Sequence, residues 1–155
     1  MKENIIVILF LFCFIFSANA QESGIGVGIM LGEPSGLSAK KWLNHSNAID
    51  AGIGWSFAEN GSIHFHADYL YHNFDLIKIS GEKMPLYFGV GGRLKMKGGD
   101  ESKGNSIGVR IPVGVAYQLQ NYPFDTFFEI VPILDISPDT RFTFNGAIGI
   151  RYYFK

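Results

Sequence analysis

Apolar and polar residues alternate along most of the chain, in segments of about ten residues separated by short polar connections. In residues 49–57 the odd positions are apolar, and the even positions hold Asp50, glycine and serine. A period of two places the two sets on opposite faces of a β-strand. The same alternation predicts strands at 63–72, 86–97, 107–119, 125–136 and 141–154. Two further candidates, 24–31 and 37–43, are joined by the turn sequence GEPSG, so we expect eight strands.

The alternation is interrupted at three places. Pro112 and Pro132 fall in the middle of predicted strands, where each removes a backbone donor, and a local bulge is the expected result. The alternation also slips after Asn73. The segment FDLIKIS (74–80) either continues the fourth strand after a bulge, with SGEK as the turn, or belongs to a loop over residues 74–84.

The apolar face of these strands has a banded composition. We place two sets of aromatic residues near opposite rims, assuming an up-and-down antiparallel barrel. The first set is Trp55, Phe57, Phe65, Phe142 and Phe144. The second set is Tyr69, Tyr71, Phe88, Tyr117, Phe128, Tyr152 and Phe154. The middle is aliphatic and uncharged, and two aromatic girdles around such a band are typical of the lipid-facing surface of an outer-membrane barrel.

The opposite face mixes glycine with charge, and in a closed barrel it faces the lumen. An eight-stranded barrel has an interior that is just wide enough for side chains to fill. We therefore predict a transmembrane barrel whose lumen is filled by ion pairs and hydrogen bonds rather than open as a wide pore. The predicted lumen network is Lys40, Asp50, His64, His66, Asp68, Arg93, Lys95, Arg110, Glu129, Asp135 and Arg151.

Three of the four histidines lie in the segment IHFHADYLYH, residues 63–72. His64 and His66 share a face, roughly 7 Å apart, and could chelate zinc if a neighbouring strand added a ligand. An outer-membrane enzyme using His64, His66 and Asp68 is a second alternative, but no serine with a convincing base stands out. We interpret the three as lumen residues with hydrogen-bonding partners. We expect no catalytic site, no turnover and no cofactor, with a metal at His64 and His66 as a minor option.

The first twenty residues have the pattern of a secretory signal peptide. Lys2 is followed by an apolar run at 5–16 and by Ser17-Ala18-Asn19-Ala20, so we expect Sec-type export with cleavage after Ala20. A lipoprotein signal at Cys13 is the rival interpretation, but the preceding Phe-Leu-Phe is too bulky for a lipidation site. The predicted domains are therefore a signal peptide at 1–20 and a β-barrel at 21–155.

Composition supports an exported barrel. The chain has 19 glycines, 15% aromatic residues and 17% charged residues, below the roughly 25% that is usual in soluble domains. Its net charge is −1 and it has no basic run, so nucleic acid is not expected as a partner. Cys13 is the single cysteine, so no disulfide is expected after cleavage.

Two parts of the chain resemble known outer-membrane proteins. The last segment, AIGIRYYFK, is similar to their C-terminal signature, with Ile148, Ile150, Tyr152 and Phe154 as the alternating apolar set and Lys155 after them. This resemblance implies recognition of the C-terminal strand by the barrel-assembly machinery. A wider set of stretches resembles a family of small outer-membrane barrels found in spirochaetes and other diderm bacteria, broadly similar to OmpA- and OmpX-type barrels. They are LGEPSGLSAKKWL, AIDAGIGWS, HADYLYH, LYFGVGGRLK, GVRIPVGVAY and AIGIRYYF.

The combined expectation is an all-β, eight-stranded barrel of the bacterial outer membrane, in contact with lipid and monomeric. Its expected role is structural or a surface interaction with an extracellular molecule, with at most a very narrow pore. The alternative is an exported soluble barrel, lipocalin-like, that binds a small apolar ligand. That alternative inverts the two faces, with Trp55 and Phe65 inside and Arg93 and Arg110 outside.

Overall fold

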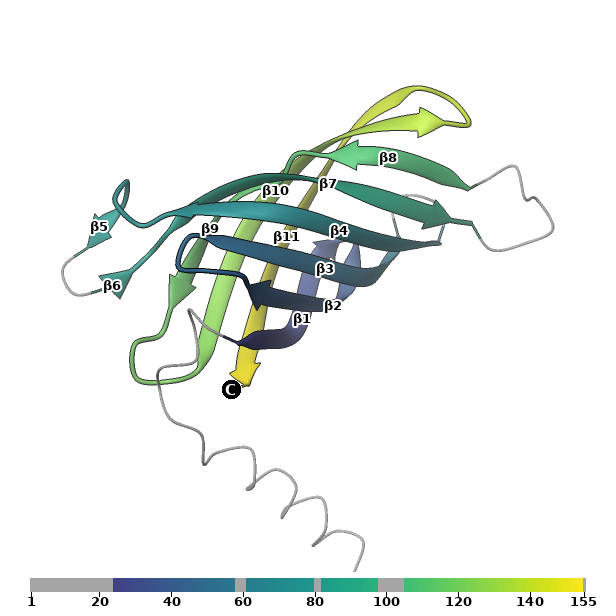
Figure 1. Cartoon of the computed structure of the whole chain (residues 1–155). Coiled ribbons are helices and arrows are strands. Elements are labelled where there is room, and N and C mark those ends of the chain that lie inside the picture. Colours follow the sequence, from purple (N-terminus) through teal and green to yellow (C-terminus); the bar gives the residue numbers. More distant parts are fainter. Residues whose placement is uncertain (1–23, 58–60, 80–81, 98–104, 155) are drawn as a thin grey trace, which may run out of the picture.

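The computed structural model describes residues 24–57, 61–79, 82–97 and 105–154 (Figure 1). The predicted signal peptide, its cleavage site and the Cys13 alternative lie outside these residues. Every regular element in the described ranges is a β-strand, and no helix there is long and apolar enough to cross a membrane. The strands are β1 (Ile25–Glu33), β2 (Ser35–Trp42), β3 (Asn47–Ser56), β4 (Ser62–Asn73), β5 (Lys78–Ile79), β6 (Glu82–Lys83), β7 (Leu86–Met96), β8 (Ser106–Arg110), β9 (Val113–Gln118), β10 (Phe124–Ser137) and β11 (Arg141–Phe154).

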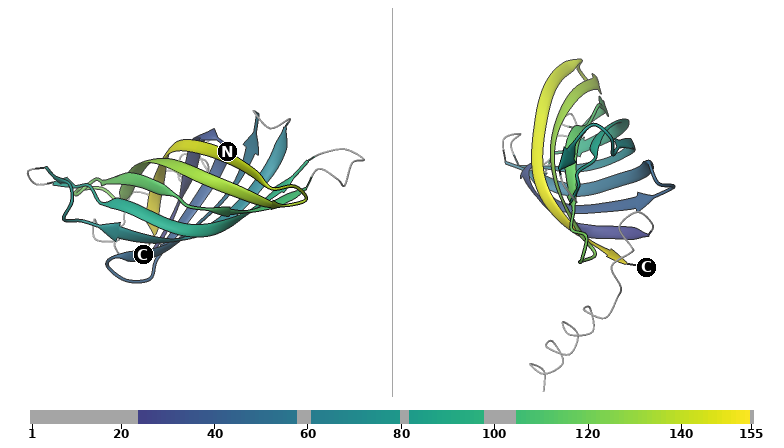
Figure 2. Two further views of the ribbon diagram at one scale, coloured as in Figure 1. Left: turned by 90° about the horizontal axis from the view of Figure 1, so that it is seen from above. Right: turned by 90° about the vertical axis from the view of Figure 1, so that its left-hand side faces the viewer.

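The strands form one closed antiparallel sheet. Each long strand pairs with its neighbour along the chain, and β11 pairs with both β10 and β1. The contact between β11 and β1 runs from the pair Ile25 and Phe154 to the pair Glu33 and Gly146. Figure 2 shows the sheet curving round until its first and last strands lie side by side. The up-and-down antiparallel barrel that the alternation predicts is confirmed.

The barrel has eight strands around its wall, because β8 and β9 are two parts of one strand. Both pair with β7 and with β10, and they are separated by Ile111 and Pro112. The Ile111 N–H donates to the carbonyl of Pro132 at 3.0 Å, and the carbonyl of Pro112 accepts from the Gly89 N–H at 2.9 Å. The proline interrupts the ladder because it has no N–H, but the strand continues across it. Pro132 stays within β10, opposite Phe144. The bulges expected at the two prolines are wrong, because the strand pairing keeps one register across each of them.

Two predicted connections differ from the structure. The prediction that GEPSG forms the turn is wrong in extent, because the connection is shorter: β1 continues to Glu33 and β2 begins at Ser35. The Ser35 hydroxyl donates to the Gly32 carbonyl at 2.9 Å and accepts from the Gly32 N–H at 3.0 Å, which folds the chain back within this short connection. FDLIKIS is not a simple continuation of β4, because only Lys78–Ile79 is extended and pairs with β6. Figure 1 shows β5 and β6 projecting beyond the barrel wall.

The barrel has two distinct ends. We call the end that holds Ile25 and Phe154 the proximal end, and the connections 43–46 and 119–123 lie there, where β4 also ends and β7 begins. At the opposite end, which we call the distal end, lie the connections at 34 and 138–140, and there β3 and β7 end and β4 and β8 begin.

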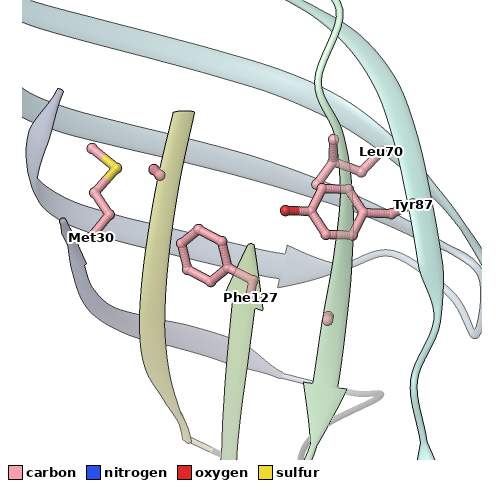
Figure 3. Packing of buried hydrophobic residues seen from close by; sticks show 6 residues of the cluster. Met30, Leu70, Tyr87 and Phe127 are labelled. Carbon is pink, nitrogen blue, oxygen red and sulfur yellow. The ribbon is translucent and has the colours of Figure 1, made fainter. Parts of the chain in front are cut away.

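Buried apolar residues occupy only part of the interior. One cluster joins Met30, Leu70, Tyr87, Ala116, Phe127 and Ala147, and Figure 3 shows its larger side chains pointing in from different strands. A second cluster of Trp42, Ala48 and Tyr153 lies nearer the proximal end. Val131 and Ile133 of β10 are also buried. Most of the remaining inward positions hold glycine or polar residues, so hydrophobic packing alone does not fill this barrel.

The close approach of β1 and β11 depends on Gly28. A Cβ atom at this position would overlap the carbonyl oxygen of Ile150 on β11. We expect Gly28→Ala to destabilise the fold by about 1–3 kcal/mol, since the backbone must move to relieve the overlap. Equilibrium unfolding of the purified protein in urea measures this loss. The matched control is Gly92→Ala, where the nearest atom would lie 3.8 Å away, and an equal loss in both variants would contradict this explanation.

Candidate functional site in the barrel interior

The structure places all eleven residues of the predicted lumen network on the inward face. All eleven are buried, and Glu129 has the largest exposed fraction, 9%. The inward face also holds Ser38, His72, Tyr87, Asp125 and Tyr153, which the predicted network does not include. The alternation contains the signal for all five, because each lies in phase with a network residue of its own strand: Ser38 with Lys40, His72 with Asp68, Tyr87 with Arg93, Asp125 with Glu129 and Tyr153 with Arg151.

Arg151 of β11 lies at the centre of the first ion-pair group. Its Nε donates to Asp125 Oδ1 at 3.0 Å, and its Nη1 donates to Asp50 and, at 3.3 Å, to Ser38 Oγ. Its guanidinium also lies over the ring of Phe127, 4.1 Å from the centroid. Because β11 and β3 are not neighbours in the wall, the contact with Asp50 crosses the interior.

Arg110 of β8 organises the second group. Its Nε lies 3.1 Å from both carboxylate oxygens of Asp68, and its Nη2 lies 3.7 Å from Glu129 Oε1. The other Glu129 oxygen accepts from the Tyr87 hydroxyl at 3.0 Å. One arginine therefore faces two carboxylates, and a tyrosine supplies the remaining hydrogen bond.

Arg93 of β7 forms the third group, towards the distal end. Its Nε and Nη2 donate to the two oxygens of Asp135 at 2.9 and 2.6 Å, a two-point arrangement that matches guanidinium to carboxylate. Thr143 Oγ1 accepts from the same Nη2 at 3.4 Å. Lys95 lies two residues along the strand, with its Nζ 3.9 Å from Asp135.

Lys40 has a different environment at the proximal end. Its Nζ donates to His72 Nε2 at 2.7 Å, and His72 Nδ1 donates to the Ser46 carbonyl at 3.2 Å, which fixes the imidazole tautomer. The ammonium also lies over the rings of Trp42 and Tyr87, at 4.4 and 5.5 Å. Aromatic faces attract a cation, so these rings supply part of the stabilisation that carboxylates supply elsewhere. The adjacent Lys41 points outward and is exposed.

Inward glycines make room for the charged groups. A Cβ at Gly91 would overlap Asp68, and one at Gly108 would overlap Asp135. Each of these glycines is the direct cross-strand neighbour of the carboxylate that it accommodates. The carboxylate therefore occupies volume that the glycine leaves empty.

His64 and His66 do not converge with Asp68. His64 Nε2 lies 3.0 Å from the Ser62 hydroxyl, and His66 Nε2 lies 3.9 Å from Asp50 Oδ1. The contacts of the Asp68 carboxylate are with Arg110. Within the described ranges, no group of three or more His, Cys, Asp or Glu side chains is arranged to hold a metal ion.

The outward face is apolar around the whole barrel. The twelve predicted girdle aromatics all point outward, and Tyr117 and Tyr152 are half-buried while the others are exposed. Trp55 is 45% exposed and Phe65 37%, whereas Arg93 is 2% exposed and Arg110 1%. The inverted faces of the lipocalin-like alternative are therefore wrong, because that fold requires the aromatic face inside.

Fold and interior together define a class: small closed antiparallel barrels with an ion-paired polar interior and an apolar outer surface. A similar solved structure is the N-terminal β-barrel domain of Pseudomonas aeruginosa OprF, with a TM-score of 0.61 and 12% identity. The match covers 86% of this chain and 98% of that one, so it extends over the whole barrel. No protein-family model and no curated protein matches the chain.

The Arg110 group provides a test of how the interior is stabilised. We expect Arg110→Met to lower the free energy of unfolding by about 3–5 kcal/mol, since Asp68 and Glu129 remain buried without their cation. Adding Asp68→Asn should recover part of the loss, because one unpaired charge is removed. Equilibrium unfolding measures both variants, with Lys41→Gln as an exposed control of the same charge change. Full stability of Arg110→Met would show that this group does not stabilise the barrel.

Proposed function

We propose that the protein is an outer-membrane β-barrel with a structural or surface-interaction role and no turnover. The observation that carries the proposal is the outward face, on which every wall strand exposes large apolar side chains. We propose that they form an aliphatic band between two aromatic girdles. A monomeric soluble protein rarely exposes a contiguous apolar surface of this kind. Lipid stabilises that surface, and closure of the sheet supplies the hydrogen bonds that a membrane requires.

The proposed orientation places the proximal end in the periplasm and the distal end outside the cell. Trp55, Phe142 and Phe144 then lie at the outer girdle, and Tyr71 and Phe154 at the inner one. The stretches similar to the small barrels of spirochaetes and other diderm bacteria support this placement. The alternating C-terminal strand also supports this placement. We propose that the barrel-assembly machinery recognises this strand after Sec-type export.

The filled interior favours a structural or interaction role over transport. Three arginine-centred groups lie at successive positions inside the barrel, and each joins strands that are not adjacent in the wall. A solute must break buried ion pairs to pass them, so the proposed pore is very narrow at most. The proposed monomer follows from closure, which leaves none of the wall strands with a free edge for a second copy.

Fractionation tests the proposed location. We expect the exported protein to sediment with outer membranes, to need detergent for extraction and to change its gel mobility on heating. The mobility change reports a barrel that resists detergent until heat unfolds it. A protein that stays soluble without detergent after export would overturn the membrane proposal.

A charge placed on the outward band tests the depth of insertion. Ile130 is 49% exposed and lies in the middle of the band, whereas Ile25 is 48% exposed and lies at the proximal rim. We expect Ile130→Arg to reduce stability in lipid vesicles by about 2–4 kcal/mol and Ile25→Arg by about 0–1 kcal/mol. Folding titrations in vesicles measure both. Equal and negligible costs would indicate that water rather than lipid surrounds the band.

A further inference from the structure

A polar pocket lies at the distal mouth of the barrel, beyond the Arg93 group. Its volume is about 100 Å³, and it opens to solvent. The polar and charged residues that line it come from β7 and the residue after it, from β8 and β10, and from the 138–140 connection and the start of β11. They are Lys95, Lys97, Ser106, Asp135, Asp139 and Arg141.

The charge of this pocket is positive among the described residues. Lys95, Lys97 and Arg141 contribute three cations against the carboxylates of Asp135 and Asp139. Asp135 is already held in the two-point contact with Arg93, a fourth cation directly beneath the pocket. Asp139, Lys97 and Arg141 are exposed, so water and salt screen all three charges, whereas Lys95 is buried. The pocket therefore favours an anion over a cation.

A buried hydroxyl in the pocket has no partner among the described residues. Ser106 is 7% exposed, and its Oγ is buried with no hydrogen bond to them. Buried polar groups are satisfied in the large majority of cases, so a hydroxyl of this kind that lines an open pocket is available to a water molecule or a ligand atom. A hydroxyl can donate to an anionic oxygen, and such charge-assisted bonds are stronger than neutral ones.

We propose that the distal pocket binds a small tetrahedral oxyanion, of the phosphate or sulfate class. Ser106 donates its hydroxyl to one oxygen, and the ammonium groups of Lys95 and Lys97 neutralise the charge. Arg141 offers a planar pair of donors suited to two oxygens of the same group. The proposal depends on the pocket alone and holds whether or not the barrel spans a membrane.

Calorimetric titration of inorganic phosphate into the purified, folded full-length protein tests the site. Ionic strength is held constant with chloride, because surface charge alone gives salt effects. We expect saturable binding at one site per chain. Ser106→Ala should weaken it about tenfold, as expected for one hydrogen bond to a charged group. Since the Ser106 hydroxyl has no partner among the described residues, this variant should keep its fold and its unfolding midpoint without phosphate.

The double variant Lys97→Gln with Arg141→Gln should abolish measurable binding, and both positions are exposed, so the fold should persist. Lys41→Gln, an exposed lysine outside the pocket, is the control and should bind as the unaltered protein does. Two results would overturn the proposal: no saturable binding of phosphate above the chloride background, or equal affinity in the unaltered protein, Ser106→Ala and the double variant.

A second titration distinguishes the two sources of the oxyanion. Glycerol phosphate replaces inorganic phosphate, at the same ionic strength. Tighter binding of the free ion supports a site for inorganic phosphate or sulfate. Tighter binding of the monoester supports a site for an esterified group carried by a larger molecule. Failure of both probes overturns the oxyanion site and leaves the proposed membrane role unaffected, because fractionation tests that role separately.

Discussion

The pairing of β1 with β11 is the interaction on which the rest of the structure depends. It closes the sheet, so no wall strand has a free edge and every side chain in the wall belongs either to the interior or to the outer surface. Closure with eight strands also fixes a narrow interior. A charged side chain that points inward must then find a partner within a few ångströms, because there is no room for a continuous column of water.

The described residues meet this constraint with balanced charge. Five buried cations and five buried carboxylates share the interior, and they are Lys40, Arg93, Lys95, Arg110 and Arg151 with Asp50, Asp68, Asp125, Glu129 and Asp135. The cost of removing these charges from water offsets much of the attraction within each pair. The largest effect of the pairs is therefore on which arrangement of the strands the chain adopts. A shift of one residue in any strand would turn its inward charges towards the outer surface. The ion pairs therefore select the register of the barrel more than they add to its stability.

The strand faces could be predicted from the sequence because alternation is local. His64, His66 and Asp68 follow the inward phase from their neighbours alone, without reference to any other strand. Their partners could not be predicted, since they depend on how far each strand is displaced along the barrel. The contact of Lys40 with His72 joins residues 32 positions apart, and nothing near either residue indicates it.

Irregular segments were predicted least well. Residues 74–85 do not alternate, and in their described parts, 74–79 and 82–85, two short extended pieces form. The bulge expected at Pro112 is wrong: the missing N–H interrupts the ladder between β8 and β9, but the pairing with β7 and β10 keeps the same register on both sides. The unsatisfied Ser106 hydroxyl had no signal in the sequence, since an orphaned group becomes visible only when its surroundings are known.

The glycines beside the carboxylates have an evolutionary consequence. The side chains of Asp68 and Asp135 fill the space beside Gly91 and Gly108, their partners on the neighbouring strands. Neither residue of such a pair can therefore be replaced by a larger one alone. Among diverging relatives, the interior should therefore change in coupled steps, with a larger residue at the glycine accompanied by a smaller one opposite. The outward aliphatic positions carry no such coupling and should drift one at a time. Substitutions on the inner and outer faces of one strand would then accumulate at different rates.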